Sequence, residues 1–378
     1  MSKAGDTANI IKQPFTQTLG TSNYRAGVNA GNSIASGGNN NTVVGDEAGT
    51  AITTGDNNTA LGKSSFETNT TGGNNTALGF QTLQVNTTAS ENTAIGHNTL
   101  SANTTGAGNL GAGYQVLSKN TTADYNTGLG YDALNKNTTG TENVSVGAFS
   151  LDANTTGIRN TAVGKSALGA NTTGDFNTAV GRTALENVTT ADGNTAVGVA
   201  AGSQTTTGAV NTAIGYLALN LNTTGQQNTA LGHIAGQNIT TGSDNICIGH
   251  DAADNLTTGS QNIAIGVDTT LSAVGGVNQI ILGQNVTCVG NDNFTFGNGS
   301  DDSNIASGAT SITAPSDVRL KEDIQDETVG LGFINDLRPV TFQWKKEKDI
   351  PSDMKAHVAG SEKRTMNGKY NHGFIAQE

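Results

Sequence analysis

The chain has 378 residues, of which 34% are hydrophobic and 4% aromatic, with 51 glycines and a net charge of −12. An acidic chain argues against nucleic acid or an anionic membrane as its partner, and no apolar run is long enough to insert into a bilayer. The composition alone would fit a disordered, low-complexity protein, but the regular spacing of its residues argues against disorder.

The N-terminal segment, residues 1–38, precedes the repeats, and we expect it to attach the protein to a larger particle. Residues 1–15 contain neither the apolar core nor the small-residue cleavage site of a secretory signal peptide. We therefore predict no secretory signal.

Residues 39–283 repeat a five-residue phrase, Asn-Thr-Ala-aliphatic-Gly, with a 17-residue period and no change of phase. A fixed short period with glycine at one phase is typical of a solenoid. Disorder does not require an aliphatic residue at one phase, so we predict that this phase, represented by Val163, is buried. The phrase begins at Asn41, Asn58, Asn75, Asn92, Asn109, Asn126, Asn143, Asn160, Asn177, Asn194, Asn211, Asn228, Asn245 and Asn262, and a last copy starts at Gln279.

One unit, residues 160–176, illustrates the predicted coil. Residues 160–164 form a short strand with Thr161 and Val163 on one face and Ala162 on the other. A second short apolar strand is predicted around Leu168, and residues 171–174 form a turn. Two strands and two turns make a flattened coil, and successive coils stack as parallel strands.

The coil is small, so the sequence predicts a trimer. A single coil encloses little apolar surface for a free-standing monomer. The small face of the strand, which carries Ala162 and its equivalents, would let three copies pack closely around an axis. We therefore predict an all-β repeat fold, a trimeric parallel β-roll or β-solenoid.

The phrases at residues 245–249 and 262–266, Asn-Ile-Cys-Ile-Gly and Asn-Ile-Ala-Ile-Gly, resemble the head repeat of trimeric autotransporter adhesins. The resemblance implies a β-roll, although that family's unit is shorter than the period of this chain. After Gly283 the glycines at Gly290 and Gly297 follow at a much closer spacing. This spacing predicts a neck or linker over residues 284–315.

Cysteine usage is sparse. The separation of Cys247 and Cys288 along the chain is not a multiple of the repeat period, so they do not stack in adjacent coils. We predict free, buried thiols.

Residues 316–378 differ abruptly from the repeats, being rich in charged residues and helix formers. Three ordered motifs, at residues 316–324, 337–344 and 373–378, resemble the intramolecular chaperone at the end of endosialidase-type phage tail spikes and fibres. The resemblance implies a small α+β domain, here partial, that trimerises the fibre and then cuts itself off before Asp317. It makes Ser316 the nucleophile and Lys321 the base; the alternative is that Ser316 merely caps a helix.

The residue after each repeat glycine predicts a stripe of rings on the rod. Four of these residues are consecutive, and rings in adjacent coils should lie about 4.8 Å apart. Such a stripe suits a receptor-binding surface for a host cell-surface glycan, and stacking among the rings is the alternative. These residues are Phe80, His97, Tyr114 and Tyr131.

Other candidate sites are weaker. His233 and His250 lie one coil apart, with Asp251 adjacent, but exposed histidine pairs are common and we predict no metal site and no cofactor. The Asn-x-Thr sequons at Asn69 and in the following coils are explained by the turn rather than by glycosylation.

These features favour a homotrimeric virion structural fibre, of tail or capsid, assembled in the host cytoplasm and bound to virion proteins through its N-terminus. A bacterial extracellular adhesin or filament is the alternative. A depolymerase is a weaker third, because the repeats lack paired carboxylates at a recurring facing position. The body is thus expected to be non-enzymatic, with single-turnover autoproteolysis before Asp317 as its one reaction.

Overall fold

The computed structural model describes residues 20–299, 302–308, 340–342, 345–350, 352, 358–363 and 371–373. The chain divides into two compact units, Met1–Pro315 and Ser316–Glu378. No helix in the described part of the chain is long and apolar enough to cross a membrane.

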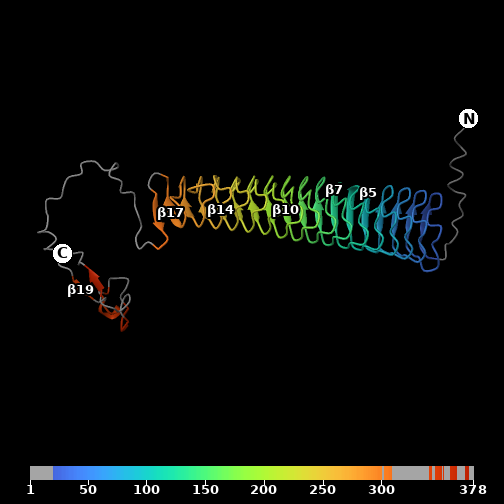
Figure 1. The fold of residues 1–378 in the computed structure, drawn as a ribbon. Helices are drawn as coiled ribbons and strands as arrows, with labels where there is room; N and C mark the ends of the chain where they lie inside the picture. The colour runs from blue at the N-terminus through green and yellow to red at the C-terminus, as the bar shows by residue number, and fades with distance from the viewer. Residues whose placement is uncertain are drawn as a thin grey trace, which may run out of the picture. The chain divides into compact units, whose positions relative to one another are not determined.

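The first unit is a parallel β-solenoid, as the 17-residue period predicts. Each coil contributes one short strand to an 18-stranded sheet, and the coils stack into a gently curved rod (Figure 1). Neighbouring strands pair in register, so that Ala162 lies beside Ala179 and Val163 beside Val180. The strands are β1 (Tyr24–Ala26), β2 (Thr42–Val44), β3 (Thr59–Leu61), β4 (Thr76–Leu78), β5 (Thr93–His97), β6 (Leu110–Tyr114), β7 (Thr127–Tyr131), β8 (Val144–Val146), β9 (Thr161–Val163), β10 (Thr178–Val180), β11 (Thr195–Val197), β12 (Thr212–Ile214), β13 (Thr229–Leu231), β14 (Ile246–Ile248), β15 (Ile263–Ile265), β16 (Ile280–Gly283), β17 (Asn293–Gly297) and β18 (Ser303–Ala306).

The stack extends beyond residues 39–283 at both ends. Strand β1 pairs with β2, and β17 pairs in parallel with β16 after a shorter step that places Ile280 beside Phe294. The close glycine spacing therefore includes one more, shorter coil. Strand β18 then pairs with β17 in the antiparallel direction and covers the edge of the last coil.

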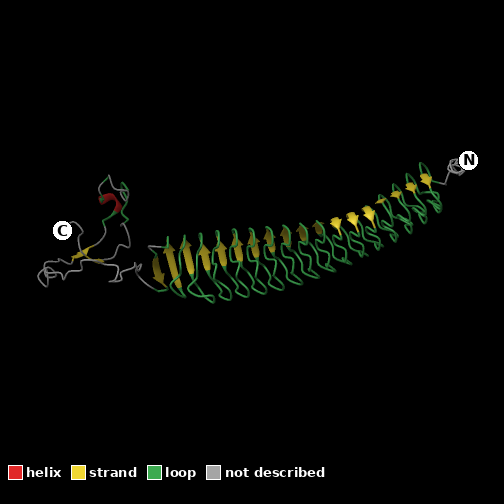
Figure 2. Cartoon of the chain, turned by 90° about the horizontal axis from the view of Figure 1, so that it is seen from above, coloured by secondary structure: helices red, strands yellow, loops and turns green. Residues whose placement is uncertain are grey.

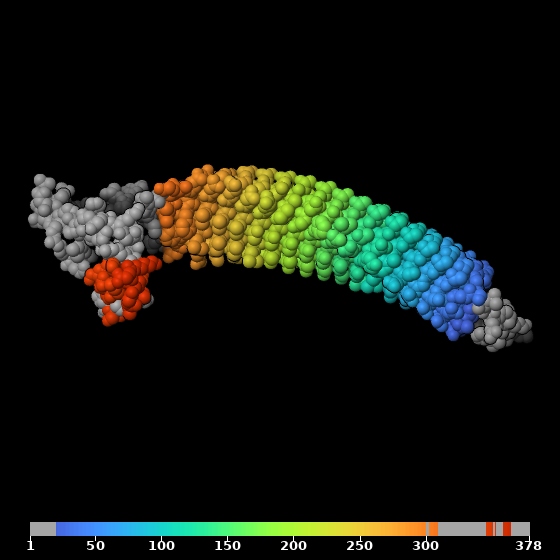
Figure 3. Space-filling model, turned by 90° about the horizontal axis from the view of Figure 1, so that it is seen from below, coloured from blue at the N-terminus to red at the C-terminus, as the bar shows by residue number. Residues whose placement is uncertain are grey.

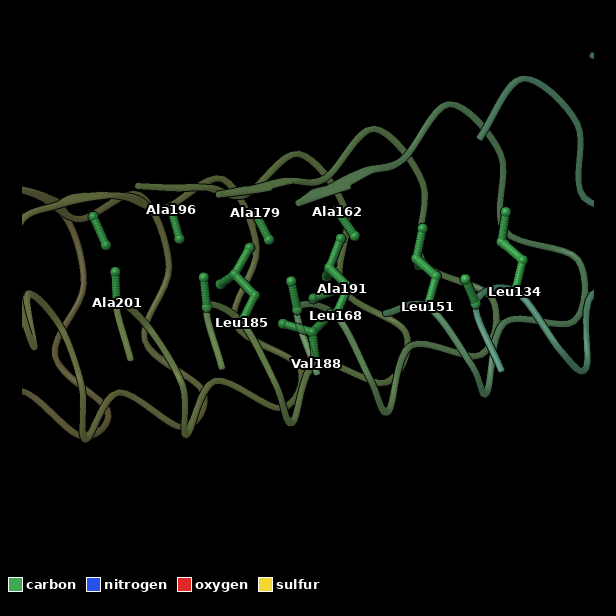
Figure 4. Packing of buried hydrophobic residues seen from close by; sticks show 14 of the residues in the cluster. Leu134, Leu151, Ala162, Leu168, Ala179, Leu185, Val188, Ala191, Ala196 and Ala201 are labelled. Carbon is green, nitrogen blue, oxygen red and sulfur yellow. The ribbon is translucent and has the colours of Figure 1, made fainter. Parts of the chain in front are cut away.

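The interior of most coils is formed by alanines from the strand and leucines from the opposite side (Figure 4). Ala162 and Leu168 are both 0% exposed, whereas Val163 is 36% exposed. Within the single chain, the prediction that the aliphatic phase is buried is therefore wrong. The prediction that the alanine face packs three copies together is wrong as well, because leucines of the same chain already occupy that side. The space between the strand and the leucine row is small, which favours alanine in most coils, whereas Val43 and Ile281 occupy this phase near the ends of the stack.

The apolar run around Leu168 is not a second strand, contrary to the prediction. Ala167 and Leu168 are consecutive and both fully buried, which strict alternation along a strand does not allow. Leu168 has a left-handed backbone, with φ of 51°, and this conformation turns both side chains inward. The coils still connect here, since Leu168 N–H donates to Ala184 C=O at 3.0 Å.

Two ladders of buried asparagines run along the rod. In the first, Asn160 N–H donates to Asn143 Oδ1 at 2.9 Å, and Asn160 Nδ2 donates to Gly174 C=O at 2.8 Å. In the second, Asn171 Nδ2 donates to Asn154 Oδ1 at 2.9 Å and also to Gly174 C=O. Each ladder satisfies backbone groups that the turns would otherwise leave unpaired inside the coil.

The second ladder contains the asparagines of the sequons. Asn69, Asn86, Asn103 and Asn120 are 0% exposed, which fits the structural interpretation of the sequons. The ladder stops where Val188 replaces asparagine. There Asn171 Oδ1 is buried without a hydrogen-bond partner in the described structure.

The repeat glycine ends each strand for a steric reason. Gly164 has φ of 134°, and a Cβ added to it would lie 2.5 Å from Gly181 C=O in the next coil. No other residue fits this close approach of backbones, so glycine recurs at this phase.

The cysteines are free and buried, as predicted. Burial raises the pKa of Cys247 to about 12, so its thiol is unreactive at neutral pH.

Within the second unit, the structure describes a two-stranded antiparallel sheet and one short 3-10 helix. Strand β19 (Val340–Phe342) pairs with β20 (Asn371–Gly373). The helix η2 (Glu347–Asp349) has Lys346 and Lys348 on either side of Glu347, and both lysines pair with Glu362.

Candidate binding surfaces of the rod

The strands lie along one side of the rod and the turns form the opposite side (Figure 2). The strands present two outward rows, the residue after each repeat asparagine and the aliphatic residue two positions later. Leu61, Leu231 and Leu282 are 44%, 45% and 48% exposed. Between residues 42 and 282 neither row contains a charged side chain. The first row is mostly threonine and the second is aliphatic. The rod thus has a long, uncharged outward face with one continuous aliphatic row, which we call the strand face.

The coils pack on one another without visible gaps along the surface seen in Figure 3. Soluble monomers rarely expose contiguous apolar patches larger than a few hundred Å². The strand face, by contrast, continues through all coils from β2 to β16.

The predicted stripe of rings is present and borders the strand face. Phe80, His97 and Tyr114 stack with ring centroids 5.1 Å apart, and Tyr114 stacks on Tyr131 at 5.0 Å. Phe80, Tyr114 and Tyr131 remain 39%, 38% and 48% exposed. The four residues are brought together as expected, and each leaves one ring edge in solvent.

One further ring belongs to this stripe. Phe149 contacts Tyr131 edge-on, with centroids 5.3 Å apart and planes at 62°. It follows Ala148, which occupies the stripe phase in that coil, so the strict 17-residue phase gave no signal for Phe149.

A second, shorter stripe lies farther along the rod. Tyr216 stacks on His233 at 5.3 Å, and His233 stacks on His250 at 5.0 Å with nearly parallel planes. Beside His250 lie Asp251 and Asp268, and the ligand atoms of these three residues are within 4.8 Å of one another. Asp268 was not singled out from the sequence, although it lies one repeat period after Asp251 and hence in the next coil at the same position.

The residues expected to cleave the chain, Ser316, Asp317 and Lys321, lie outside the described residues.

The second unit matches a known protein family. Residues 316–378 match the Peptidase_S74 family model, chaperone of endosialidase. This match confirms the resemblance of the three C-terminal motifs. The endosialidase chaperone domain begins at Ser316, where the second compact unit also begins. No curated protein and no solved structure matches the chain.

Proposed function

We propose that the chain is the shaft of a homotrimeric virion fibre, of tail or capsid, that attaches to the host cell surface. The observation that carries this proposal is the uncharged strand face, which runs along a solenoid joined to an endosialidase chaperone domain. A long repetitive rod has to align with two other copies at the correct coil. An assembly domain on the same chain would provide that alignment.

The strand face fits copies of the same chain better than an unrelated partner. Its two rows repeat with the period of the rod, so a second copy matches them coil for coil along the whole length. Burial of both rows would remove apolar surface in every coil, at about 25 cal/mol per Å². The three-fold arrangement places the strand faces around a common axis and leaves the turns in solvent.

The ring stripe lies at the rim of this interface rather than within it. The same row carries Asp46, Lys63, Lys165 and Arg182 in other coils. Charged side chains are depleted from interface cores and tolerated at rims. The exposed parts of the rings therefore remain available, and together they form an aromatic strip along which a sugar chain can lie.

Replacing Phe80, His97, Tyr114 and Tyr131 together with serine is expected to abolish binding to a neutral surface polysaccharide. The reason is the loss of the aromatic strip. A neutral polysaccharide is the appropriate ligand, because the acidic body disfavours anionic polymers. Retention of the full-length protein on immobilised bacterial polysaccharides measures the effect.

Tyr125→Ser is the matched control, because Tyr125 is 65% exposed but lies outside the stripe. Loss of binding in the four-residue variant, with the mass of the assembly unchanged, supports a receptor site. Unchanged binding would show that the stripe has only a structural role. A lower mass of the assembly would show that the stripe lies in the interface between chains.

The chaperone domain supplies the register of assembly. Near-identical coils can pair one step out at little local cost, sliding by one repeat. A domain that trimerises first at one end prevents this error. Once the coils have paired along the whole rod, slow unfolding keeps the fibre assembled.

Ser316→Ala is expected to leave a full-length, folded fibre, whereas the unmodified chain is cut before Asp317. Serine attack needs a base, and Lys321 occupies the matching position. Mass spectrometry of both purified proteins distinguishes them. Equal cutting of the two would refute the serine mechanism, and two intact chains would show that this domain does not cleave.

A further inference from the structure

The end of the second stripe brings one imidazole and two carboxylates together on the surface. His250 Nδ1 lies 3.4 Å from Asp268 Oδ1, and Asp251 completes a group whose ligand atoms all lie within 4.8 Å of one another. Two atoms bound to one metal ion by bonds of about 2.0–2.2 Å lie at most about 4.4 Å apart. The 3.4 Å pair therefore fits directly, and the third side chain has to move only slightly to share the same ion.

The backbone holds these residues in place. Asp251 N–H donates to His233 C=O at 3.1 Å, and Asp268 N–H donates to His250 C=O at 3.0 Å. Both aspartates have left-handed backbones, with φ of 52° and 51°. The ladder that stacks the coils thus fixes the spacing of the three side chains before any ligand binds.

The two aspartates place like charges in adjacent coils, an arrangement that is destabilising by itself. A cation at this point would offset the repulsion between the two carboxylates.

Other carboxylates in the same row are arranged differently. Glu47 accepts a hydrogen bond from Ser64 in the next coil at 3.1 Å, and Asp132 accepts one from Asn135 at 3.3 Å. In those coils a neutral donor approaches the carboxylate. At Asp251 and Asp268 the approaching groups are a second carboxylate and an imidazole, a set that suits a metal ion.

We propose that His250, Asp251 and Asp268 bind a divalent transition-metal ion of the Zn²⁺ class, with water completing the coordination. Imidazole nitrogen selects this class over Mg²⁺ and Ca²⁺, which prefer oxygen ligands alone. The ion links the coil that follows β14 to the coil that follows β15. It acts as a clamp between them near the end of the rod.

Calorimetric titration of the full-length protein with ZnCl2 tests the proposal. We expect His250→Gln and Asp268→Asn each to weaken the affinity by roughly tenfold or more, because each removes a ligand. Zn²⁺ should also raise the melting temperature of the unmodified protein but not of Asp268→Asn, since ligand that binds the native state alone stabilises it.

Two matched controls define the ligand set. Asp132→Asn makes the same change in the same row far from the cluster, and His233→Gln removes the stacked histidine that is not a ligand. Both should bind Zn²⁺ as the unmodified protein does. Binding that survives in His250→Gln and Asp268→Asn, that is lost in His233→Gln, or that MgCl2 competes away equally would overturn the site, as would the absence of Zn²⁺ binding.

Discussion

Replacing Ala162 with aspartate is expected to unfold the middle of the rod, whereas the same change at Val163 should leave each chain folded. Ala162 is 0% exposed and faces the leucine row, so its carboxylate would be buried without a partner. Such a buried charge costs about 3–5 kcal/mol. Val163 is 36% exposed in the single chain, and there a carboxylate stays in water.

The two variants also separate folding from assembly. In the trimer, Val163→Asp places three like charges around the axis, so it should weaken association while the circular dichroism spectrum remains that of a β-rod. Ala162→Asp should lose that spectrum at a lower denaturant concentration. An Ala162→Asp rod as stable to denaturant as the unmodified protein, or a Val163→Asp chain that unfolds as a monomer, would show that the two faces have been assigned the wrong way round.

The second large effect is expected in the first asparagine ladder. Asn75 Nδ2 donates to Asn58 Oδ1 at 3.1 Å and to Ala89 C=O at 3.0 Å, and Asn75 is 1% exposed. Asn75→Asp keeps the size but replaces this donor with an acceptor, and it adds a buried charge. A loss of about 3 kcal/mol or more in the free energy of unfolding follows.

This loss should depend on pH. Burial, together with the two acceptors Asn58 Oδ1 and Ala89 C=O that would face the new carboxyl, should raise its pKa in the folded state above its unfolded value of about 3.9. At neutral pH the charged carboxyl therefore lowers the free energy of unfolding. This loss becomes smaller as the pH falls and the carboxyl of the folded state takes up a proton. Denaturant titrations at two pH values measure it.

The neighbouring residue provides the control. Asn74 is exposed and has a left-handed backbone, which aspartate also tolerates. Asn74→Asp should change the free energy of unfolding by less than about 0.5 kcal/mol. Equal effects at Asn74 and Asn75 would show that the buried ladder contributes no more than a surface turn does.

The 17-residue period was sufficient to predict the solenoid and its parallel register, because only stacked coils place Ala162 beside Ala179 in every turn. It was insufficient to decide which side of the strand is buried. Both Val163 and Ala162 are apolar, and a strand alternates in either case. The space left by Leu168 on the facing side decides the matter, and that depends on a left-handed leucine that no turn rule foresees.

The candidate surfaces, too, could be predicted only in part. The ring stripe could be predicted because one residue per coil, read at a constant phase, gives the spacing of Phe80 and Tyr114 directly. Phe149 and Asp268 required the structure. Phe149 lies one residue out of phase, and Asp268 becomes significant only beside His250 in the preceding coil.

Sedimentation of the full-length Ser316→Ala protein tests the central claim most directly, because this change keeps every chain whole. The proposed assembly predicts a single species of three times 38.3 kDa. A variant with aspartate at Val163, Val180 and Val197 should shift toward one chain while keeping its β-structure. A folded single-chain species in the protein that lacks these three changes would contradict the assembly of the rod through its strand face.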